Sequence, residues 1–244
     1  METPFTDERI FLKLTPLVKT PGNRYYQIDW IIQYFPKDQE QLEYVEPYAG
    51  GASLLLNKPP SQFEGINDCN AGIIEIYKAI RDEPKIFTGR LKRVKYCEAT
   101  FIRATKKTEF EDYLDHAINE YILRRMSVAG SKNTFGGSEK TWNKLIEQLP
   151  VIAKRLVNVH IFCKDAKQII QAFNHAGVFV YADPPPLEDT DDSANQHVEL
   201  ADLLANFLGK VLITGPYCTL YRRIYQNWKC VKNSETKDAL WVNF

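Results

Sequence analysis

The sequence predicts an α/β protein with a largely parallel sheet, and three stretches support this prediction. Residues 178–182 (VFVYA) are β-branched, aromatic or small, and an acid and three prolines follow them. Such a run is typical of a strand that is buried on both faces and that the prolines end. Residues 44–56 are typical of a strand, a tight turn and a helix, and residues 63–80 of a second strand followed by a helix.

Composition places the chain among soluble globular proteins, with a cytoplasmic location expected. Its 244 residues can bury one large core, or a core and a smaller subdomain, and the 44% of hydrophobic residues fits such a core. No apolar run approaches the length of a membrane span, and the acidic first eight residues do not resemble a secretory signal. The five cysteines are scattered without a metal-site spacing and suit a reducing cytosol, so neither a metal nor a membrane partner is expected.

Charge is distributed unevenly along the chain, although the formal net charge is zero. Residues 85–155 hold 15 Lys and Arg against 8 Asp and Glu, whereas the remaining residues hold 16 basic and 23 acidic ones. A basic middle segment is a plausible footprint for nucleic-acid phosphate, and solvated lysines on helices explain it equally well.

The first elements expected along the chain are a turn and a helix. Pro21-Gly22-Asn23 predicts the turn. The helix is predicted by apolar residues that recur at helical spacing until Pro36 ends it, namely Ile28, Ile31, Ile32 and Phe35. Arg24 lies between the two elements, where a cation can receive an anionic group, although this signal is weak by itself.

Small residues at positions 49–53 predict a turn that lets the backbone approach a ligand closely. They do not form a GxGxxG motif, so a dinucleotide is not favoured. Asp68 ends the next strand about 20 residues later, where an acid commonly takes a ribose hydroxyl. The turn and the acid in this order favour a nucleoside ligand, whereas each alone could be a core turn or a helix cap.

Asp183 stands where the chain leaves the predicted buried strand. Ligands of open α/β sheets bind beyond the carboxyl ends of the strands, so a carboxylate presented there on a stiff proline turn is a candidate for chemistry. A lone Asp-Pro-Pro can also be a strand followed by a rigid loop, and the rest of the chain decides between the two interpretations.

Taken in order, these motifs resemble the α-class, or Dam-like, DNA N6-adenine methyltransferases over nearly the whole chain. Each motif is weak by itself, but the ordered set is specific. The resemblance is carried by residues 19–24 (KTPGNR, similar to K-W-[AP]-G-G-K), 46–53 (EPYAGGAS, similar to E-P-F-x-G-[GA]-[GA]-S), 66–70 with 77–82 (INDCN and YKAIRD), Asp183-Pro184-Pro185 (the start of D-P-P-Y) and the tail segments 209–215 and 240–244.

The resemblance implies a Rossmann-like S-adenosylmethionine-dependent methyltransferase fold with a helical target-recognition insertion. The methyltransferase domain would comprise residues 1–84 and 151–244, and residues 85–150 would form the insertion that binds DNA. Double-stranded DNA and a cognate restriction endonuclease are the implied partners. Cations would contact phosphate and polar side chains would read base edges in the major groove. The implied DNA contacts are Arg124, Arg125, Lys132 and Asn133.

S-adenosylmethionine is the cofactor that the resemblance implies, lying across the carboxyl ends of the strands. Its methionine carboxylate would lie near Arg24, which replaces the usual lysine, and Asp68 would hold its ribose. Thr20 replaces a tryptophan that usually packs on the cofactor. The remaining implied contacts are Tyr48, Ala49 and Gly50 along the adenosine, Asp165 at its adenine, and Asp183.

Asp183, Pro184, Pro185 and Pro186 are the catalytic residues that the resemblance implies. Asp183 and the Pro184 carbonyl would accept both N6 hydrogens of a flipped adenine, which directs the nitrogen lone pair at the methyl group. Pro186 replaces an aromatic residue that stacks on the base in the family, and such stacking is worth about 1–3 kcal/mol. Residues 187–197 are expected to form a short acidic loop, and the five acids from Asp183 to Asp192 would repel a DNA strand.

The function predicted from the sequence is S-adenosylmethionine-dependent N6-methylation of adenine in DNA. The departures at Thr20, Asn23 and Pro186 and the acidic loop leave an alternative, a catalytically degenerate homologue that binds DNA or cofactor without turnover. A third possibility is a methyltransferase of RNA or of a small nucleobase, which the basic insertion disfavours. The four histidines show no constellation, so surface or capping roles are predicted for them.

Overall fold

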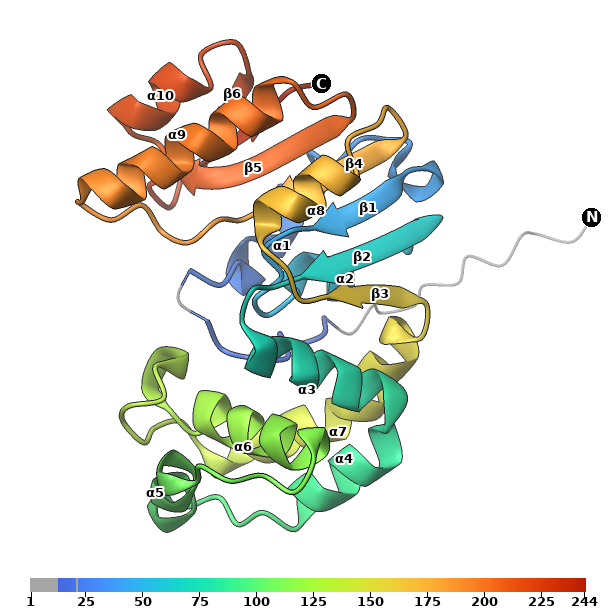
Figure 1. Ribbon diagram of the computed structural model, residues 1–244, viewed down its shortest axis with the longest axis vertical. Helices are drawn as coiled ribbons and strands as arrows, with labels where there is room; N and C mark the ends of the chain where they lie inside the picture. The colour runs from blue at the N-terminus through green and yellow to red at the C-terminus, as the bar shows by residue number, and fades with distance from the viewer. Residues whose placement is uncertain (1–12, 21) are drawn as a thin grey trace, which may run out of the picture.

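A seven-stranded sheet in the order β3-β2-β1-β4-β5-β7-β6 organises the structure (Figure 1). The structure is a computed structural model that describes residues 13–20 and 22–244. Residues 1–12 and Pro21, the first residue of the expected turn, lie outside the described residues. The strands are β1 (Glu43–Glu46), β2 (Phe63–Asn67), β3 (Val159–Phe162), β4 (Val178–Ala182), β5 (Lys210–Pro216), β6 (Lys229–Lys232) and β7 (Asp238–Val242).

Helices cover both faces of this sheet and extend beyond its β3 edge (Figure 1). None of the described helices has the length and apolar character needed to cross a membrane. The helices are α1 (Ile28–Ile32), α2 (Ser53–Asn57), α3 (Ala71–Asp82), α4 (Pro84–Lys92), α5 (Glu98–Lys106), α6 (Tyr113–Arg125), α7 (Glu139–Leu156), α8 (Ala166–Ala172), α9 (Asp191–Ala205) and α10 (Thr219–Ile224), with 3-10 turns η1 (Tyr25–Gln27), η2 (Gln39–Gln41) and η3 (Val128–Gly130).

Alternate residues of the central strands contribute their side chains to two hydrophobic cores, one on each face of the sheet. Phe179 and Tyr181 of β4 pack with α1, α2 and α3 on one face, whereas Val178 and Val180 pack with α8, α9 and α10 on the other. All five residues of β4 are buried, and the strand lies parallel to both β1 and β5. The predicted buried strand and the predicted α/β fold with a largely parallel sheet are therefore confirmed.

The strand order reverses direction between β1 and β4, which lie side by side in the middle of the sheet. From β1 the chain moves outward to β2 and β3, and from β4 it moves the opposite way to β5. Such a switch point opens a crevice beyond the carboxyl ends of the two strands. The glycine turn (residues 47–52) follows β1 and Asp183 follows β4, so both predicted motifs reach this crevice.

The helices α4–α7 lie together beyond the β3 edge (Figure 1). They occupy most of the segment for which a helical insertion was predicted, residues 85–150. α3 contacts both α6 and α7, and the aromatic side chains of Phe87, Tyr121 and Trp142 join α4, α6 and α7. One hydrophobic core continues from the sheet into these helices, so they are packed against the sheet layer rather than tethered to it.

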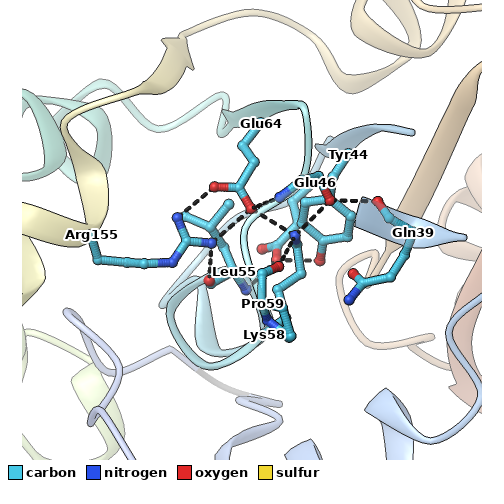
Figure 2. Close-up of polar contacts among 9 residues, drawn as sticks. Gln39, Tyr44, Glu46, Leu55, Lys58, Pro59, Glu64 and Arg155 are labelled. Atoms are coloured by element: carbon cyan, nitrogen blue, oxygen red, sulfur yellow. Dashed lines mark hydrogen bonds and ion pairs between the residues drawn. The ribbon is translucent and has the colours of Figure 1, made fainter. Parts of the chain in front are cut away.

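A buried polar cluster joins α7 to the sheet and to α2, the helix that follows the glycine turn (Figure 2). Glu64 of β2 pairs with Lys58 at 2.6 Å and with Arg155 near the end of α7. Arg155 Nη2 also donates to the carbonyl of Leu55 in α2 at 2.7 Å. Glu46 at the end of β1 accepts from the backbone N–H of Leu55 at 2.8 Å. The cluster thus links β1, β2, α2 and α7.

Two helix boundaries differ from those expected. α1 ends at Ile32 rather than at Phe35, because the N–H groups of Tyr34 and Phe35 bond three residues back instead of four and tighten the chain into turns. α9 begins at Asp191, so residues 191–197 are helical rather than part of the acidic loop. Thr190 caps this helix by accepting from the N–H of Ser193.

Candidate active site

A cavity of about 690 Å³ opens at the carboxyl ends of β1 and β4. Its volume lies within the range of small-molecule sites, about 300–1,000 Å³. Five segments line it: the stretch before η1, the end of β1 with the glycine turn and the start of α2, Asp68 and Cys69 after β2, residues 165–167 at the start of α8, and residues 181–186 with part of α9. The structure brings together there the predicted residues Thr20, Arg24, Tyr48, Ala49, Gly50, Asp68, Asp165, Asp183, Pro184, Pro185 and Pro186.

Asp183 is mostly withdrawn from solvent, with 20% of its side chain exposed. Its Oδ1 accepts a hydrogen bond from Nε of Arg24 at 2.9 Å, and no described residue donates to its Oδ2. Burial raises the pKa of Asp183 to about 6, Arg24 opposes this shift, and the nearby Asp238 carboxylate adds to it. The carboxylate is therefore ionised at neutral pH and has one oxygen that can accept a hydrogen bond from a ligand.

Arg24 makes two ion pairs from one guanidinium group. While Nε meets Asp183, Nη1 lies 2.9 Å from Oδ2 of Asp238 at the start of β7. Burial lowers the pKa of Arg24, but the two carboxylates outweigh it and raise the pKa above its ordinary value. The contact of Arg24 with the cofactor carboxylate stays a prediction. Nη2 is the nitrogen that could make it, because no described residue engages this atom.

The glycine turn adopts backbone conformations that few residues tolerate. Gly50 and Ala52 both have a φ of 47°, in the left-handed region that favours glycine. A Cβ atom at Gly51 would lie 2.6 Å from Nδ2 of Asn23 and 2.9 Å from the carbonyl oxygen of Val18. Gly51 is therefore needed because the segment before η1 packs across the turn, which differs from the close approach of a ligand expected for these small residues.

Asp68 is fixed at the cavity by the backbone around it. It accepts from the N–H of Gly50 at 3.0 Å and from the N–H of Asn70 at 2.9 Å, which leaves lone pairs for a hydroxyl pair. Asp165 caps α8 by accepting from the N–H of Lys167 at 2.7 Å. Tyr48 is half-buried beside them, and burial raises the pKa of its hydroxyl above the usual range. Two carboxylates, an aromatic ring and a cation fit the ribose, adenine and carboxylate groups of S-adenosylmethionine.

The three prolines after Asp183 differ in exposure. Pro184 is buried, whereas Pro185 and Pro186 are exposed. Pro186 lies against the segment before η1, because a Cβ atom on Gly22 would be 3.7 Å from its Cγ. Asp191 and Asp192, two of the acids expected in a loop, lie in the first turn of α9, where the helix dipole favours negative charge. Part of the acidic character near the site therefore has a structural reason.

His197 is a cavity residue that the sequence analysis missed. It is 5% exposed, and its Nδ1 lies 2.9 Å from the hydroxyl of Tyr221 on α10. Burial lowers the pKa of His197, and an interaction with the backbone of Pro185 opposes that shift. The surface or capping role predicted for it is therefore wrong. Its spacing to Leu200 and Leu204, three and seven residues on, could have identified it as part of the buried face of α9.

The four residues predicted to contact DNA lie at the end of α6 and in the following loop, and they differ in accessibility. Arg124 and Arg125 are each 6% exposed. Arg124 Nε donates to Glu120 at 3.2 Å, and Arg125 Nε donates to a main-chain carbonyl of the N-terminal segment at 2.9 Å. Their burial does not support the predicted phosphate contacts, because both guanidinium groups act within the fold. Lys132 is half-buried and pairs with Glu120 at 2.7 Å, whereas Asn133 is exposed.

Comparisons with known proteins found a matching family model and similar solved structures. A family model described as D12 class N6 adenine-specific DNA methyltransferase matches residues 21–238. Among solved structures, the chain is similar to a conserved hypothetical protein from Streptococcus pyogenes, with 10% identity, 90% of this chain and 93% of that chain covered, and a TM-score of 0.42. It is also similar to the putative methyltransferase yhhF from Escherichia coli, with 10% identity, 94% of this chain and 89% of that chain covered, and a TM-score of 0.40.

Proposed function

The chain belongs to the D12 class N6 adenine-specific DNA methyltransferase family, and we propose that it uses S-adenosylmethionine to methylate N6 of adenine in double-stranded DNA. The order of its motifs favours the α-class within this family. The observation that carries the proposal is the position of Asp183, an ionised carboxylate at the switch point of the sheet, in the same cavity as the glycine turn and Asp68.

Asp183 and the carbonyl of Pro184 act in this proposal as hydrogen-bond acceptors. The lone pair of adenine N6 is delocalised into the ring, so the amino group is a poor nucleophile until its two hydrogens are accepted. Oδ2 of Asp183 is the acceptor that no described residue engages. The cofactor supplies the activated methyl group, and the protein contributes positioning and preorganised dipoles to a direct displacement.

S-adenosylmethionine is proposed to lie along the glycine turn. Tyr48, Ala49 and Gly50 would line the adenosine, Asp68 would hold the ribose hydroxyls and Asp165 would contact the adenine. Nη2 of Arg24 would bind the methionine carboxylate, and Thr20 would contact the cofactor with a smaller side chain than the usual tryptophan. The proposal is supported by the cavity that all these residues share and by the carboxylate of Asp68, which the backbone holds in place.

Double-stranded DNA is proposed to contact the helices α4–α7, in a target-recognition region of residues 85–150. The excess of basic residues in this part of the chain supports the proposal. Lys132 and Asn133 remain the candidates for contact, because Arg124 and Arg125 are buried. A cognate restriction endonuclease would be the natural partner of such an enzyme.

A degenerate homologue that binds without turnover is the second candidate, and Pro186 favours it. The base-stacking position carries an exposed proline instead of an aromatic ring, and exposed acids at 188, 189, 191 and 192 follow it. Losing a stacking contribution of about 1–3 kcal/mol corresponds to roughly ten- to a hundredfold weaker capture of the base. The acceptors at Asp183 and Pro184 remain, so slow transfer is expected rather than none.

Incorporation of a tritiated methyl group into mixed-sequence duplex DNA tests the proposed function. We expect transfer by the wild type, and a loss of at least about a hundredfold in Asp183→Asn, which removes the anionic acceptor. Asp202→Asn, an exposed acid of α9, is the matched control and should transfer at the wild-type rate.

Calorimetry and the transfer assay together separate the two candidates. We expect the wild type to bind S-adenosylmethionine, and Asp68→Ala to bind it about tenfold more weakly, a loss of about 1.4 kcal/mol. Binding without any transfer, in the wild type and in Pro186→Tyr, would leave the degenerate homologue as the function. No binding at all would remove both candidates that depend on the cofactor.

A further inference from the structure

Asp238 is distant from Asp183 in the sequence but close to it in the structure. β7 returns antiparallel beside β5, and Asp238 at its start pairs with Pro216 at the end of β5. Because β5 lies parallel to β4, this brings Asp238 to the edge of the sheet at which Asp183 leaves β4. Arg24 connects the two carboxylates, with Nε 2.9 Å from Asp183 and Nη1 2.9 Å from Asp238.

Oδ2 of Asp238 is held by several donors at once. It accepts from Nε2 of Gln27 at 2.7 Å and from the hydroxyl of Thr236 at 3.1 Å, in addition to Nη1 of Arg24. Burial raises the pKa of Asp238, but these contacts outweigh it and lower the pKa below its ordinary value. Asp238 is therefore a fixed anion, and it holds one edge of the guanidinium group in place.

We propose that Asp238 is a positioning residue for methyl transfer, which holds the plane of the Arg24 guanidinium so that Asp183 receives only one hydrogen bond from it. Arginine favours bidentate pairs with carboxylates, and such a pair would engage both oxygens of Asp183. Held by Asp238, Arg24 supplies the positive charge that favours ionised Asp183 and leaves Oδ2 free for the amino group. The inference rests on the proposed function of Asp183 as an acceptor.

The other titratable groups around Asp183 come from three elements. Tyr181 of β4 and Tyr221 of α10 interact with its charge, and burial raises the pKa of both hydroxyls well above their ordinary value. Both therefore stay neutral over the pH range in which Asp183 titrates. His197 of α9 contacts Tyr221 and has a pKa lowered by burial, so the titration of Asp183 has to be observed on its own carboxyl group.

Carbon-13 NMR of protein labelled at the aspartate carboxyl groups observes that titration, with Asp183→Asn assigning the signal. In Asp238→Ala we expect the pKa of Asp183 to fall by about one unit, because a like charge is removed and Arg24 can close on both oxygens. In Arg24→Gln we expect it to rise. Glu235→Ala, which removes an exposed acid from the same hairpin turn, should leave it unchanged. An unchanged or raised pKa in Asp238→Ala would overturn the proposal.

Methyl transfer supplies the second readout. Asp238→Ala should lower kcat on the order of a hundredfold, as misplaced reacting groups do, while Asp238→Asn should keep most of the activity because its amide oxygen still accepts from Nη1. Equal losses in the two variants would contradict the positioning role. If the wild type shows no transfer but the NMR shifts appear, the proposed function fails and the hold of Asp238 on Arg24 stands.

Discussion

Asp183 shows how a single ionisation is set by competing contacts. Burial at the end of β4 disfavours the charged carboxylate, and Arg24 favours it from one side only. The balance places the pKa of Asp183 at about 6, so its carboxylate changes charge just below neutral pH. Arg24 shares its charge between Asp183 and Asp238, so the carboxylate is kept ionised without being fully engaged.

The pH dependence of methyl transfer should report this pKa. We expect kcat/KM to fall as the pH drops below about 6, tenfold for each further unit, because protonated Asp183 has lost the anionic acceptor. A pH–rate profile between pH 5 and 8 measures it. A flat profile through pH 6 would show that Asp183 does not act as an ionised acceptor.

The same shift predicts how stability depends on pH. The folded-state pKa of Asp183 lies above the ordinary value of 3.8, so the folded protein binds this proton more tightly than the unfolded chain. Its contribution to the free energy of unfolding is complete below the ordinary pKa and is lost as the pH rises through about 6. Urea unfolding of the wild type and of Asp183→Asn at pH 4.5 and 7 measures this contribution. The wild type should lose it between the two pH values, whereas the free energy of unfolding of Asp183→Asn should lack this part of the pH dependence.

Pro186 is the second residue on which the proposed methyl transfer depends. Pro186→Tyr would restore an aromatic ring beside the cavity, and we expect it to raise methyl transfer to duplex DNA by about ten- to a hundredfold. Pro186→Ala is the matched control, because it removes the proline ring without adding a π-system, and its rate should stay near that of the wild type. Equal rates for the Tyr and Ala variants would show that stacking is not limiting.

At the scale of elements, the site depends on how the glycine turn and the segment before η1 pack together. Two carboxylates fix the turn. Glu46 accepts from the N–H of Leu55 in α2, and Asp68 accepts from the N–H of Gly50. The segment crosses it at Gly51, where Asn23 and Val18 leave no room for a side chain. The packing of this segment on Gly51 therefore positions both the glycine turn, where the cofactor is predicted to bind, and Arg24.

Gly51→Ala should destabilise the protein by about 1–3 kcal/mol, because the new methyl group would lie 2.6 Å from Nδ2 of Asn23 and 2.8 Å from Cβ of Pro16. Gly89→Ala is the matched control, since a Cβ atom at this position of α4 meets nothing within 4 Å. It should stabilise the helix by about 0.5–1 kcal/mol. Chemical denaturation measures both, and equal effects would contradict the packing argument.

At the scale of the whole molecule, the helices α4–α7 and the sheet behave as parts of one packed structure. They share a hydrophobic core, and Glu64 of β2 pairs with Lys58, just after α2, and with Arg155 of α7 (Figure 2). Burial raises the pKa of Glu64, but the two cations outweigh it and lower the pKa, so the acid stays charged. The cluster connects the region proposed to bind DNA to the strands that carry the cavity.

Glu64→Gln should destabilise the whole molecule by about 3–5 kcal/mol, because Lys58 and Arg155 would keep buried charges without a counter-ion. Asp29→Asn is the control, since it breaks the exposed pair with Lys13 and should leave stability unchanged. Thermal unfolding monitored by circular dichroism measures both. A separate early transition of the helices in Glu64→Gln would show that the cluster joins two units, whereas one shifted transition would show a single cooperative fold.

The fold could be predicted from the sequence where local patterns were strong. The apolar run at 178–182, the small residues at 49–53 and the acids at 68 and 183 predicted strands, a turn and a shared crevice, because strand periodicity and proline act locally. The family motifs could also be recognised from short stretches of the sequence. The exposure of Arg124 and Arg125 could not be predicted in this way, since a basic pair at a helix end gives no information on which side the core lies.

Sequence alone determined that this chain is an α/β protein with a glycine turn, an acid after β2 and Asp183 before three prolines. Only the tertiary structure decided what surrounds Asp183. Arg24, Gln27 and Asp238 come from opposite ends of the chain, and His197 and Tyr221 come from two helices packed on one face of the sheet. Contacts of this kind depend on strand order and on the antiparallel return of β7, which link residues far apart in sequence that no local pattern connects.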